Sequence, residues 1–303
     1  MSDEAARQRR ALAAGLLLVA LWGAAFSIQK VAYAAMGPGA FLFLRSFVMG
    51  CCAAGLLALR GRPLWPRLAP GEWRPFLFTT TAGPVLHIAM VTYGIHWSTA
   101  FSSSLIMSCG PVFTLILLRL MRGTRLGPRQ VLGVVAAFCG VLLFMGEKLL
   151  AADWRASGGD LLLLVASLVF ALYTIWVTPF VTRHGGVEVM CWTTLLASPV
   201  LMVLSAGAAW SAGYAGLAPG IWVAFFWTVV VSAFFGWMIW GHVNAVRGVA
   251  RTAPLLYLVP PVAGLVAWLT VGETFGPQKM AGAALALGGV ALAQLAGRAG
   301  GRV

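Results

Sequence analysis

The fold is decided by the stretch Ala100–Met145, which reads AFSSSLIMSCGPVFTLILLRLMRGTRLGPRQVLGVVAAFCGVLLFM. Its pattern of glycines and prolines returns, in outline, from Ala250 to the C-terminus. The matching residues stand 149 or 150 positions apart, in the pairs Pro111/Pro261, Gly127/Gly276, Pro128/Pro277, Gly133/Gly282 and Gly140/Gly289. Each copy contains an apolar helix interrupted by proline, a turn that opens on Gly-Pro, and a second apolar helix. This self-similarity predicts a protein of two related halves.

Apolar residues dominate the composition. Hydrophobic residues make up 60% of the chain and charged residues only 10%, whereas soluble domains carry about 25% charged residues. We therefore expect an all-α polytopic membrane protein. The net charge of +13 lies in short breaks between apolar runs, so a lipid bilayer surface explains it better than nucleic acid. The five cysteines fall inside apolar runs without metal-binding spacing, and we expect neither a metal site nor a disulfide.

Ten apolar runs are long enough, at about 20 residues, to cross a hydrocarbon core of about 30 Å. They are approximately Ala11–Ala35, Gly39–Leu59, Pro75–Ile95, Ser98–Leu118, Pro128–Met145, Asp160–Val181, Val187–Ala209, Gly220–Trp240, Val249–Val271 and Pro277–Ala296. The predicted organisation is a tail at 1–10, a five-helix repeat at 11–146, an outer loop at 147–159, a second five-helix repeat at 160–297 and a tail at 298–303.

The basic residues predict the orientation, because Lys and Arg are retained in cytoplasmic loops. With both termini in the cytoplasm, sixteen of the 21 fall in inner segments: Arg7, Arg9, Arg10, Arg60, Arg62, Arg67, Arg74, Arg119, Arg122, Arg125, Arg129, Arg183, Arg247, Arg251, Arg298 and Arg302. Five spans per half is an odd number, so the second copy enters the membrane from the opposite side. Inverted repeats of this kind are typical of transporters that alternate access around a site at the repeat interface.

A family resemblance rests on two groups of residues. The first two runs contain Trp22, Gly23, Phe26, Lys30 and Arg45, and the second copy ends with Gly272, Glu273, Gly276 and Pro277. This pattern resembles the EamA-type drug/metabolite transporter superfamily, although Thr124 stands where the first copy of that family usually has glutamate. Within the superfamily the chain looks most like bacterial exporters of aromatic and other amino acids. The resemblance implies a ten-helix, multi-pass protein of a bacterial-type inner membrane, with a central cavity for a small-molecule substrate.

Charged side chains inside the runs are the first candidates for substrate binding, because burying them in lipid is costly. Lys30 either snorkels to the outer boundary or joins a polar-aromatic face. Arg45 either bonds helix-end carbonyls or binds the substrate. His87 either satisfies a neighbouring polar group or contacts a ligand or proton. We expect Lys30 and Arg45 to converge on a substrate carboxylate, unless Glu273 at the outer face is their partner.

Helix breaks and aromatic residues complete the predicted site. The prolines that interrupt the fourth and ninth runs either line a cavity or mark a packing kink: Pro111, Pro254, Pro260 and Pro261. The remaining predicted substrate contacts include seven aromatic residues, for which an ordinary core position is the alternative: Trp22, Phe26, Tyr173, Trp176, Trp237, Trp240 and Tyr257. Gln29 joins them on the face of Trp22 and Phe26, and Ser104 and Ser108 lie on the proline-bearing face of the fourth run, with a packing kink as the alternative. By contrast, close helix packing is the role predicted for four glycines, Gly133, Gly140, Gly282 and Gly289.

Enzyme motifs are missing from the sequence. It contains no HExxH, no Walker-type loop and no serine-centred elbow, so we expect no catalytic residues and no cofactor, and no ATPase subunit is evident. The acidic residues fall at or outside the ends of the runs, which disfavours lipophilic cations as substrates. The predicted function is export of small amphipathic metabolites, above all aromatic or apolar amino acids, by alternating access. A broad-specificity drug/metabolite efflux transporter is the alternative, ahead of a channel or a membrane-embedded transferase.

Overall fold

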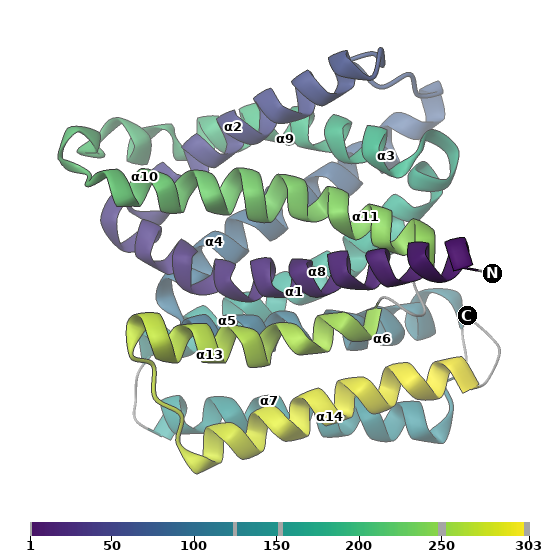
Figure 1. The fold of residues 1–303 in the computed structure, drawn as a ribbon, viewed down its shortest axis with the longest axis vertical. Coiled ribbons are helices and arrows are strands. Elements are labelled where there is room, and N and C mark those ends of the chain that lie inside the picture. The colour runs from purple at the N-terminus through teal and green to yellow at the C-terminus, as the bar shows by residue number, and fades with distance from the viewer. Residues whose placement is uncertain (1, 124–125, 151–153, 248–252, 300–303) are drawn as a thin grey trace.

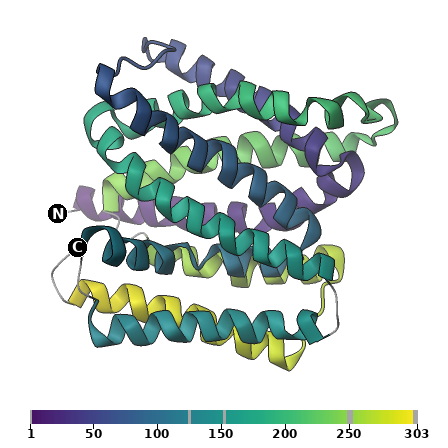
Figure 2. The same ribbon diagram turned by 180° about the vertical axis from the view of Figure 1, so that it is seen from behind.

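The protein is a stack of helices. The computed structural model describes residues 2–123, 126–150, 154–247 and 253–299, and all regular structure in those ranges is helical. The helices run roughly parallel or antiparallel to one another (Figure 1). The view from behind shows the same stacking, with the α7/α14 pair at one edge (Figure 2). Helix α1 begins and α14 ends on the same side of the stack (Figure 1).

Each half contributes a similar series of elements. The first half contains α1 (Ser2–Met36), α2 (Pro38–Leu59), η1 (Pro70–Glu72), α3 (Trp73–Thr80), η2 (Thr81–His87), α4 (Ile88–Trp97), α5 (Ala100–Met107), α6 (Gly110–Arg122) and α7 (Pro128–Leu150). The second half contains α8 (Trp154–His184), α9 (Gly186–Trp210), η3 (Tyr214–Gly216), α10 (Pro219–Phe226), η4 (Trp227–Phe235), α11 (Gly236–Arg247), η5 (Ala253–Leu258), α13 (Val259–Val271) and α14 (Pro277–Ala299).

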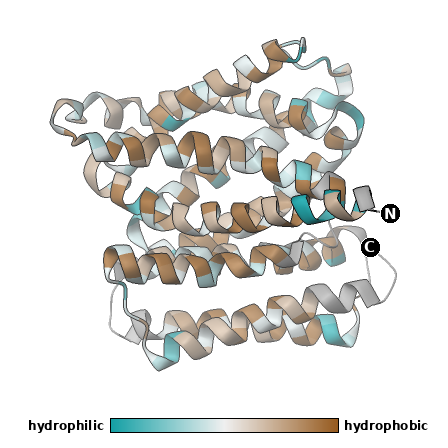
Figure 3. Ribbon diagram, in the orientation of Figure 1, coloured by the Kyte–Doolittle hydropathy of each residue, from teal (hydrophilic) through white to brown (hydrophobic). Residues whose placement is uncertain are grey.

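Eight helical segments of the described chain are long and apolar enough to cross a membrane, and apolar residues cover most of their length (Figure 3). A further apolar helix, Leu255–Val271, is shorter. The tenth predicted run corresponds to α14, which is not among the eight, so the count of ten spans remains a prediction. The predicted outer loop at 147–159 is helical at both ends, because α7 extends to Leu150 and α8 begins at Trp154.

The two halves correspond element by element. Helices α7 and α14 both have 23 residues, and their first residues stand 149 positions apart. The π-helical segments η2 and η4 interrupt corresponding helical rods of the two halves. Packing is also reciprocal, because α1 contacts α11 and α13, whereas its counterpart α8 contacts α4 and α6.

Glycines allow α7 and α14 to approach at backbone distance, which confirms the close helix packing predicted for these glycines. A Cβ added to Gly133 would lie 2.7 Å from the Gly289 carbonyl oxygen, and one added to Gly282 would lie 2.6 Å from the Phe144 nitrogen. Gly140 faces Ala286 in the same way. Small residues at helix interfaces are typical of membrane proteins, where close van der Waals packing drives helix association.

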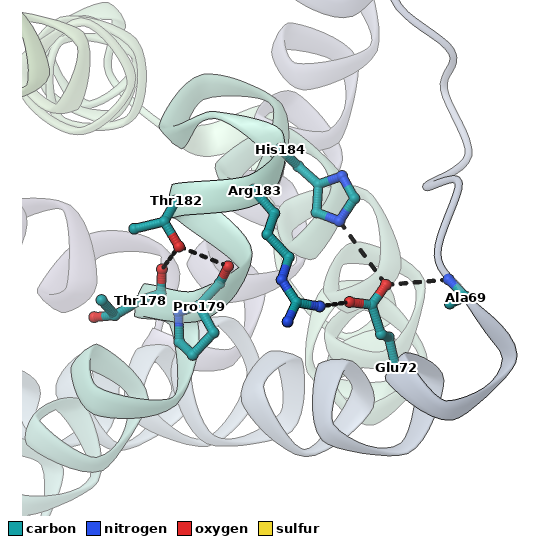
Figure 4. Close-up of polar contacts among 7 residues, drawn as sticks. All are labelled: Ala69, Glu72, Thr178, Pro179, Thr182, Arg183 and His184. Atoms are coloured by element: carbon teal, nitrogen blue, oxygen red, sulfur yellow. Dashed lines mark hydrogen bonds and ion pairs between the residues drawn. The ribbon is translucent and has the colours of Figure 1, made fainter.

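Ion pairs tie the helix ends at the arginine-rich end of the bundle. The Glu72 carboxylate pairs with Arg183, accepts the Ala69 N–H at 3.1 Å and lies 4.0 Å from the His184 ring nitrogen, as Figure 4 shows. Glu188, which is largely buried, lies within 3.6 Å of two arginines of the loop after α2, Arg60 and Arg62. These contacts hold the ends of α2, α3, α8 and α9 together.

Candidate functional site

Three tryptophans meet between α1 and α11. The ring of Trp22 on α1 lies 5.8 Å from that of Trp237 and 5.9 Å from that of Trp240. The indole N–H of Trp22 donates to the Ser232 carbonyl oxygen at 3.0 Å. Ser232 belongs to the π-helical segment η4, so an irregular backbone fixes the orientation of the Trp22 ring.

Phe170 on α8 extends this cluster into the other half of the molecule. Its ring lies 6.3 Å from Trp237 and 4.7 Å from His87. His87 is 9% exposed and belongs to η2, the counterpart of η4. The rings of Trp240, Trp22, Trp237, Phe170 and His87 therefore form a continuous series that crosses the interface of the halves. Sequence reasoning missed Phe170, because a phenylalanine in an apolar run carries no polar signal.

The tautomer of His87 follows from its backbone contact. Its Nδ1 lies 3.0 Å from the Ala166 carbonyl oxygen. A carbonyl oxygen only accepts, so Nδ1 carries the proton of this hydrogen bond. In the neutral ring Nε2 is then a hydrogen-bond acceptor.

Tyr173 is placed against the same π-helical segment. Its ring lies 5.9 Å from Phe170 and directly over Gly83, where an added Cβ would clash with three ring carbons. Only glycine leaves room for this aromatic contact. The sequence predicted Tyr173 and His87 as separate candidates, and the structure brings both to Phe170.

Arg45 is a cation without a protein counter-ion among the described residues. It lies on α2 and is half-buried, and no hydrogen bond or ion pair holds its guanidinium within those ranges. Its charge is close enough to Tyr33 and His87 to act on both electrostatically. The Tyr33 hydroxyl in turn donates to Gln29 Oε1 at 2.7 Å. The guanidinium therefore lies within electrostatic reach of a hydroxyl on α1 and an imidazole on η2.

Lys30 and Glu273 have other protein contacts. The Lys30 ammonium donates to the Ser98 carbonyl oxygen. The Glu273 carboxylate accepts the Phe101 N–H at 3.3 Å, at the start of α5, and in the described part of the chain it pairs with neither Lys30 nor Arg45. Within the described ranges, Arg45 thus differs from Lys30 in having no protein hydrogen bond or ion pair.

The prolines stand where helices restart. Pro111 lies in the first turn of α6, and Pro260 and Pro261 lie in the first turn of α13, where a missing N–H costs least. The hydroxyl of the predicted contact Ser104 donates to the Phe101 carbonyl oxygen within α5, and that of Ser108, the residue after α5, donates to the Ser104 carbonyl oxygen.

Three predicted aromatic residues lie apart from the aromatic series. Phe26 packs against the apolar cluster that includes Tyr33 and Phe41, and Tyr257 packs against a separate core cluster. Trp176 is 36% exposed and has no ring contact among the residues described. Pro254 lies in η5, before α13, and its side chain is outside the described part.

Sequence comparison gives the family of this two-halved bundle. The profile of the EamA-like transporter family matches residues 9–146 and again residues 157–295. The chain belongs to the EamA-like transporter family. This result confirms the resemblance in the sequence, and it makes the chain a transporter and a multi-pass protein of the bacterial-type inner membrane.

Relatives of this EamA-like chain include named exporters. A probable terminal-alkyne amino-acid exporter of Streptantibioticus cattleyicolor is 27% identical over 288 residues, which cover 93% of both chains. A probable amino-acid metabolite efflux pump of Salmonella typhimurium is 25% identical, with 91% of both chains covered. A solved crystal structure superposes with a TM-score of 0.63 over 96% of this chain and 98% of the other. At 16% identity that likeness is one of fold.

Proposed function

We propose that this EamA-like transporter exports small amphipathic metabolites, above all amino acids with aromatic or apolar side chains. Ten spans in two inverted repeats, with both termini in the cytoplasm, would alternate access to a site between the halves. The two relatives named as amino-acid transporters support the substrate class. The observation that carries the proposal is the placement of Arg45, a cation without a counter-ion in the described chain, near the end of an aromatic series.

Each end of an amino acid finds a chemical match in this arrangement. The planar guanidinium of Arg45 is suited to hold a carboxylate through two parallel hydrogen bonds. The rings of Trp22, Trp237 and Phe170 offer faces for an aromatic or apolar side chain. Neutral His87 offers Nε2 as an acceptor for a substrate N–H donor.

The alternative is a broad-specificity drug/metabolite efflux transporter. Aromatic surfaces also attract organic cations, since a cation over a ring face is favoured electrostatically. Arg45 argues against such substrates, because a positive charge in a low-dielectric site repels a second one.

Transport by purified protein in liposomes tests the proposal. Vesicles loaded with unlabelled phenylalanine or methionine are expected to take up labelled phenylalanine by exchange, with saturation at high concentration. A quaternary ammonium dye is expected neither to be transported nor to inhibit this exchange. Saturable dye transport that excess phenylalanine leaves unchanged would favour the alternative. Flux that never saturates would indicate a channel.

A further inference from the structure

A chain of polar contacts joins α1 to α8 at the end of the bundle opposite the arginine-rich end, which we call the arginine-poor end. The Lys30 ammonium on α1 donates to the Ser98 carbonyl oxygen, and the Ser98 hydroxyl donates to a carboxylate oxygen of Asp160 on α8. Ser98 lies in the short linker between α4 and α5. One residue thus connects a cation from the first half of the chain to a carboxylate from the second.

Asp160 is more deeply placed than its sequence position indicates. The sequence puts it at the edge of an apolar run, whereas the structure places it in the second turn of α8 with 0% of its surface exposed. A buried carboxylate is strongly destabilising without hydrogen bonds and compensating charge. The Ser98 hydroxyl supplies a hydrogen bond to this carboxylate. The Lys30 ammonium is close by, because it donates to the carbonyl oxygen of the same serine.

Two glycines allow the close approach of α4 and α8 on which this contact depends. A Cβ added to Gly159 would lie 2.7 Å from the Ser98 nitrogen, and one added to Gly94 would lie 2.7 Å from the Leu163 side chain. Helices α4 and α8 therefore approach too closely for larger residues at these positions. The Ser98–Asp160 bond is set by helix packing rather than by two mobile surface side chains.

An apolar cluster closes the bundle around the same layer. Its buried members come from α1, α2, α4, α5, α8, α10 and η4, and each is at most 7% exposed: Ala32, Tyr33, Met36, Phe41, Ile95, Ile106, Leu163, Phe225 and Val229. Because both halves contribute, the helices must separate here before a solute can pass through this end.

The arginine-rich end is tied differently. There the side-chain amide of Gln8 donates to the Val246 carbonyl oxygen at 3.0 Å. Arg247 donates to the Gln8 carbonyl oxygen at 3.2 Å. These two hydrogen bonds join α1 to α11. Arg183 and Glu72 join α8 to α3. The corresponding helices α1 and α8 are thus bridged by Ser98 at one end, and each is tied to another helix at the opposite end.

We propose that Lys30, Ser98 and Asp160 form a latch that holds the transport path closed at the arginine-poor end and breaks when that end opens. If the helices separated, water would solvate the charges of Lys30 and Asp160. This solvation would offset part of the free energy lost with their contacts. The latch follows from the geometry and from membership of a transporter family, so it does not depend on which substrate is carried. It gives Lys30 a conformational role in place of a substrate contact.

Reaction of buried cysteines with a water-soluble maleimide tests the latch in the purified full chain. One reporter, Ile106→Cys, lies in the apolar cluster, and a second, Val189→Cys, lies in the buried core of the arginine-rich end. The five native cysteines are replaced in both. We expect Lys30→Met and Asp160→Asn to accelerate reaction at Ile106→Cys by about tenfold or more, which is about 1.4 kcal/mol, and to leave Val189→Cys unchanged.

Glu273→Gln is the matched control, because it neutralises the carboxylate that caps α5 and is expected to change neither rate. Faster maleimide reaction at both reporters would indicate that the variant unfolds. In that case Ser98→Ala tests the latch instead, because it removes only the hydroxyl that bonds Asp160. A selective rise at Ile106→Cys in Ser98→Ala supports the latch. Unchanged reaction at that reporter in Ser98→Ala, or in folded Lys30→Met, overturns it. If Lys30→Met raises KM without changing the reaction rate, the residue contacts substrate and the latch is wrong.

Discussion

Arg45 is the residue on which the proposed substrate class depends most directly. A hydrogen bond to a charged group contributes about 1.5–3 kcal/mol, so loss of a carboxylate contact is expected to raise KM by about ten- to a hundredfold. We expect Arg45→Met to produce this loss in liposome exchange and to leave the melting temperature of the substrate-free protein unchanged or higher, because no protein contact within the described chain is removed. Arg45→Lys is expected to be intermediate, since lysine keeps the charge without the fork.

Arg74→Met provides the matched control at the residue scale. Arg74 is exposed at the start of α3 and is expected to tolerate the change in both assays. If Arg45→Met lowers the melting temperature as much as it impairs exchange, Arg45 holds the fold together and the carboxylate must be bound elsewhere.

Polar residues in apolar runs could be identified from the sequence, but their partners could not. Arg45 and His87 stood out because polar side chains are rare there. His87 is one end of the aromatic series, and the Arg45 charge acts on it electrostatically. Phe170, which joins the two halves of that series, looks like any other apolar residue until distant helices are packed together. Asp160 was assigned to a run boundary, because hydropathy does not show that α8 begins six residues earlier, at Trp154.

Close packing of α7 and α14 predicts a sharp difference between glycines at the scale of the element. A Cβ at Gly140 would overlap the Ala286 backbone, whereas one at Gly288 of α14 meets nothing within 4 Å. We expect Gly140→Ala to cost about 1–3 kcal/mol through overpacking and Gly288→Ala to be neutral or stabilising, because alanine favours the helix. Thermal melting in detergent compares the two variants. Equal melting temperatures would mean that α7 and α14 can move apart freely.

Glycine spacing was therefore sufficient to predict that these helix faces are closely packed, although it did not identify the partner helix. Helix irregularity was not predictable. The run Pro75–Ile95 reads as one continuous helix, yet η2 contains a π-helical segment around Pro84. The equivalent segment η4 contains no proline at all. Such irregularities depend on tertiary contacts, among them the seating of Trp22 on Ser232 and of Tyr173 on Gly83.

At the scale of the whole molecule, the arginine distribution predicts that both termini and the Glu72–Arg183 contact face the cytoplasm. A cysteine introduced at Leu64, in the exposed loop after α2, is expected to resist an impermeant maleimide in intact cells and to react in inside-out vesicles. The opposite pattern would invert the assigned topology, and with it the side to which the latch opens.

The coupling of transport to protons is also a property of the whole molecule. His87 is the titratable group that the sequence places near the midplane, and its Nδ1 is bonded to the Ala166 carbonyl oxygen. We therefore expect either facilitated export down the amino-acid gradient or weak coupling through His87. Liposome flux with and without a pH gradient distinguishes these cases. Facilitated export gives no accumulation of the substrate, whereas weak coupling gives accumulation that His87→Ala abolishes. His242→Ala, at an exposed position of α11, is the control and is expected to leave accumulation unchanged. Strong accumulation that survives His87→Ala contradicts both.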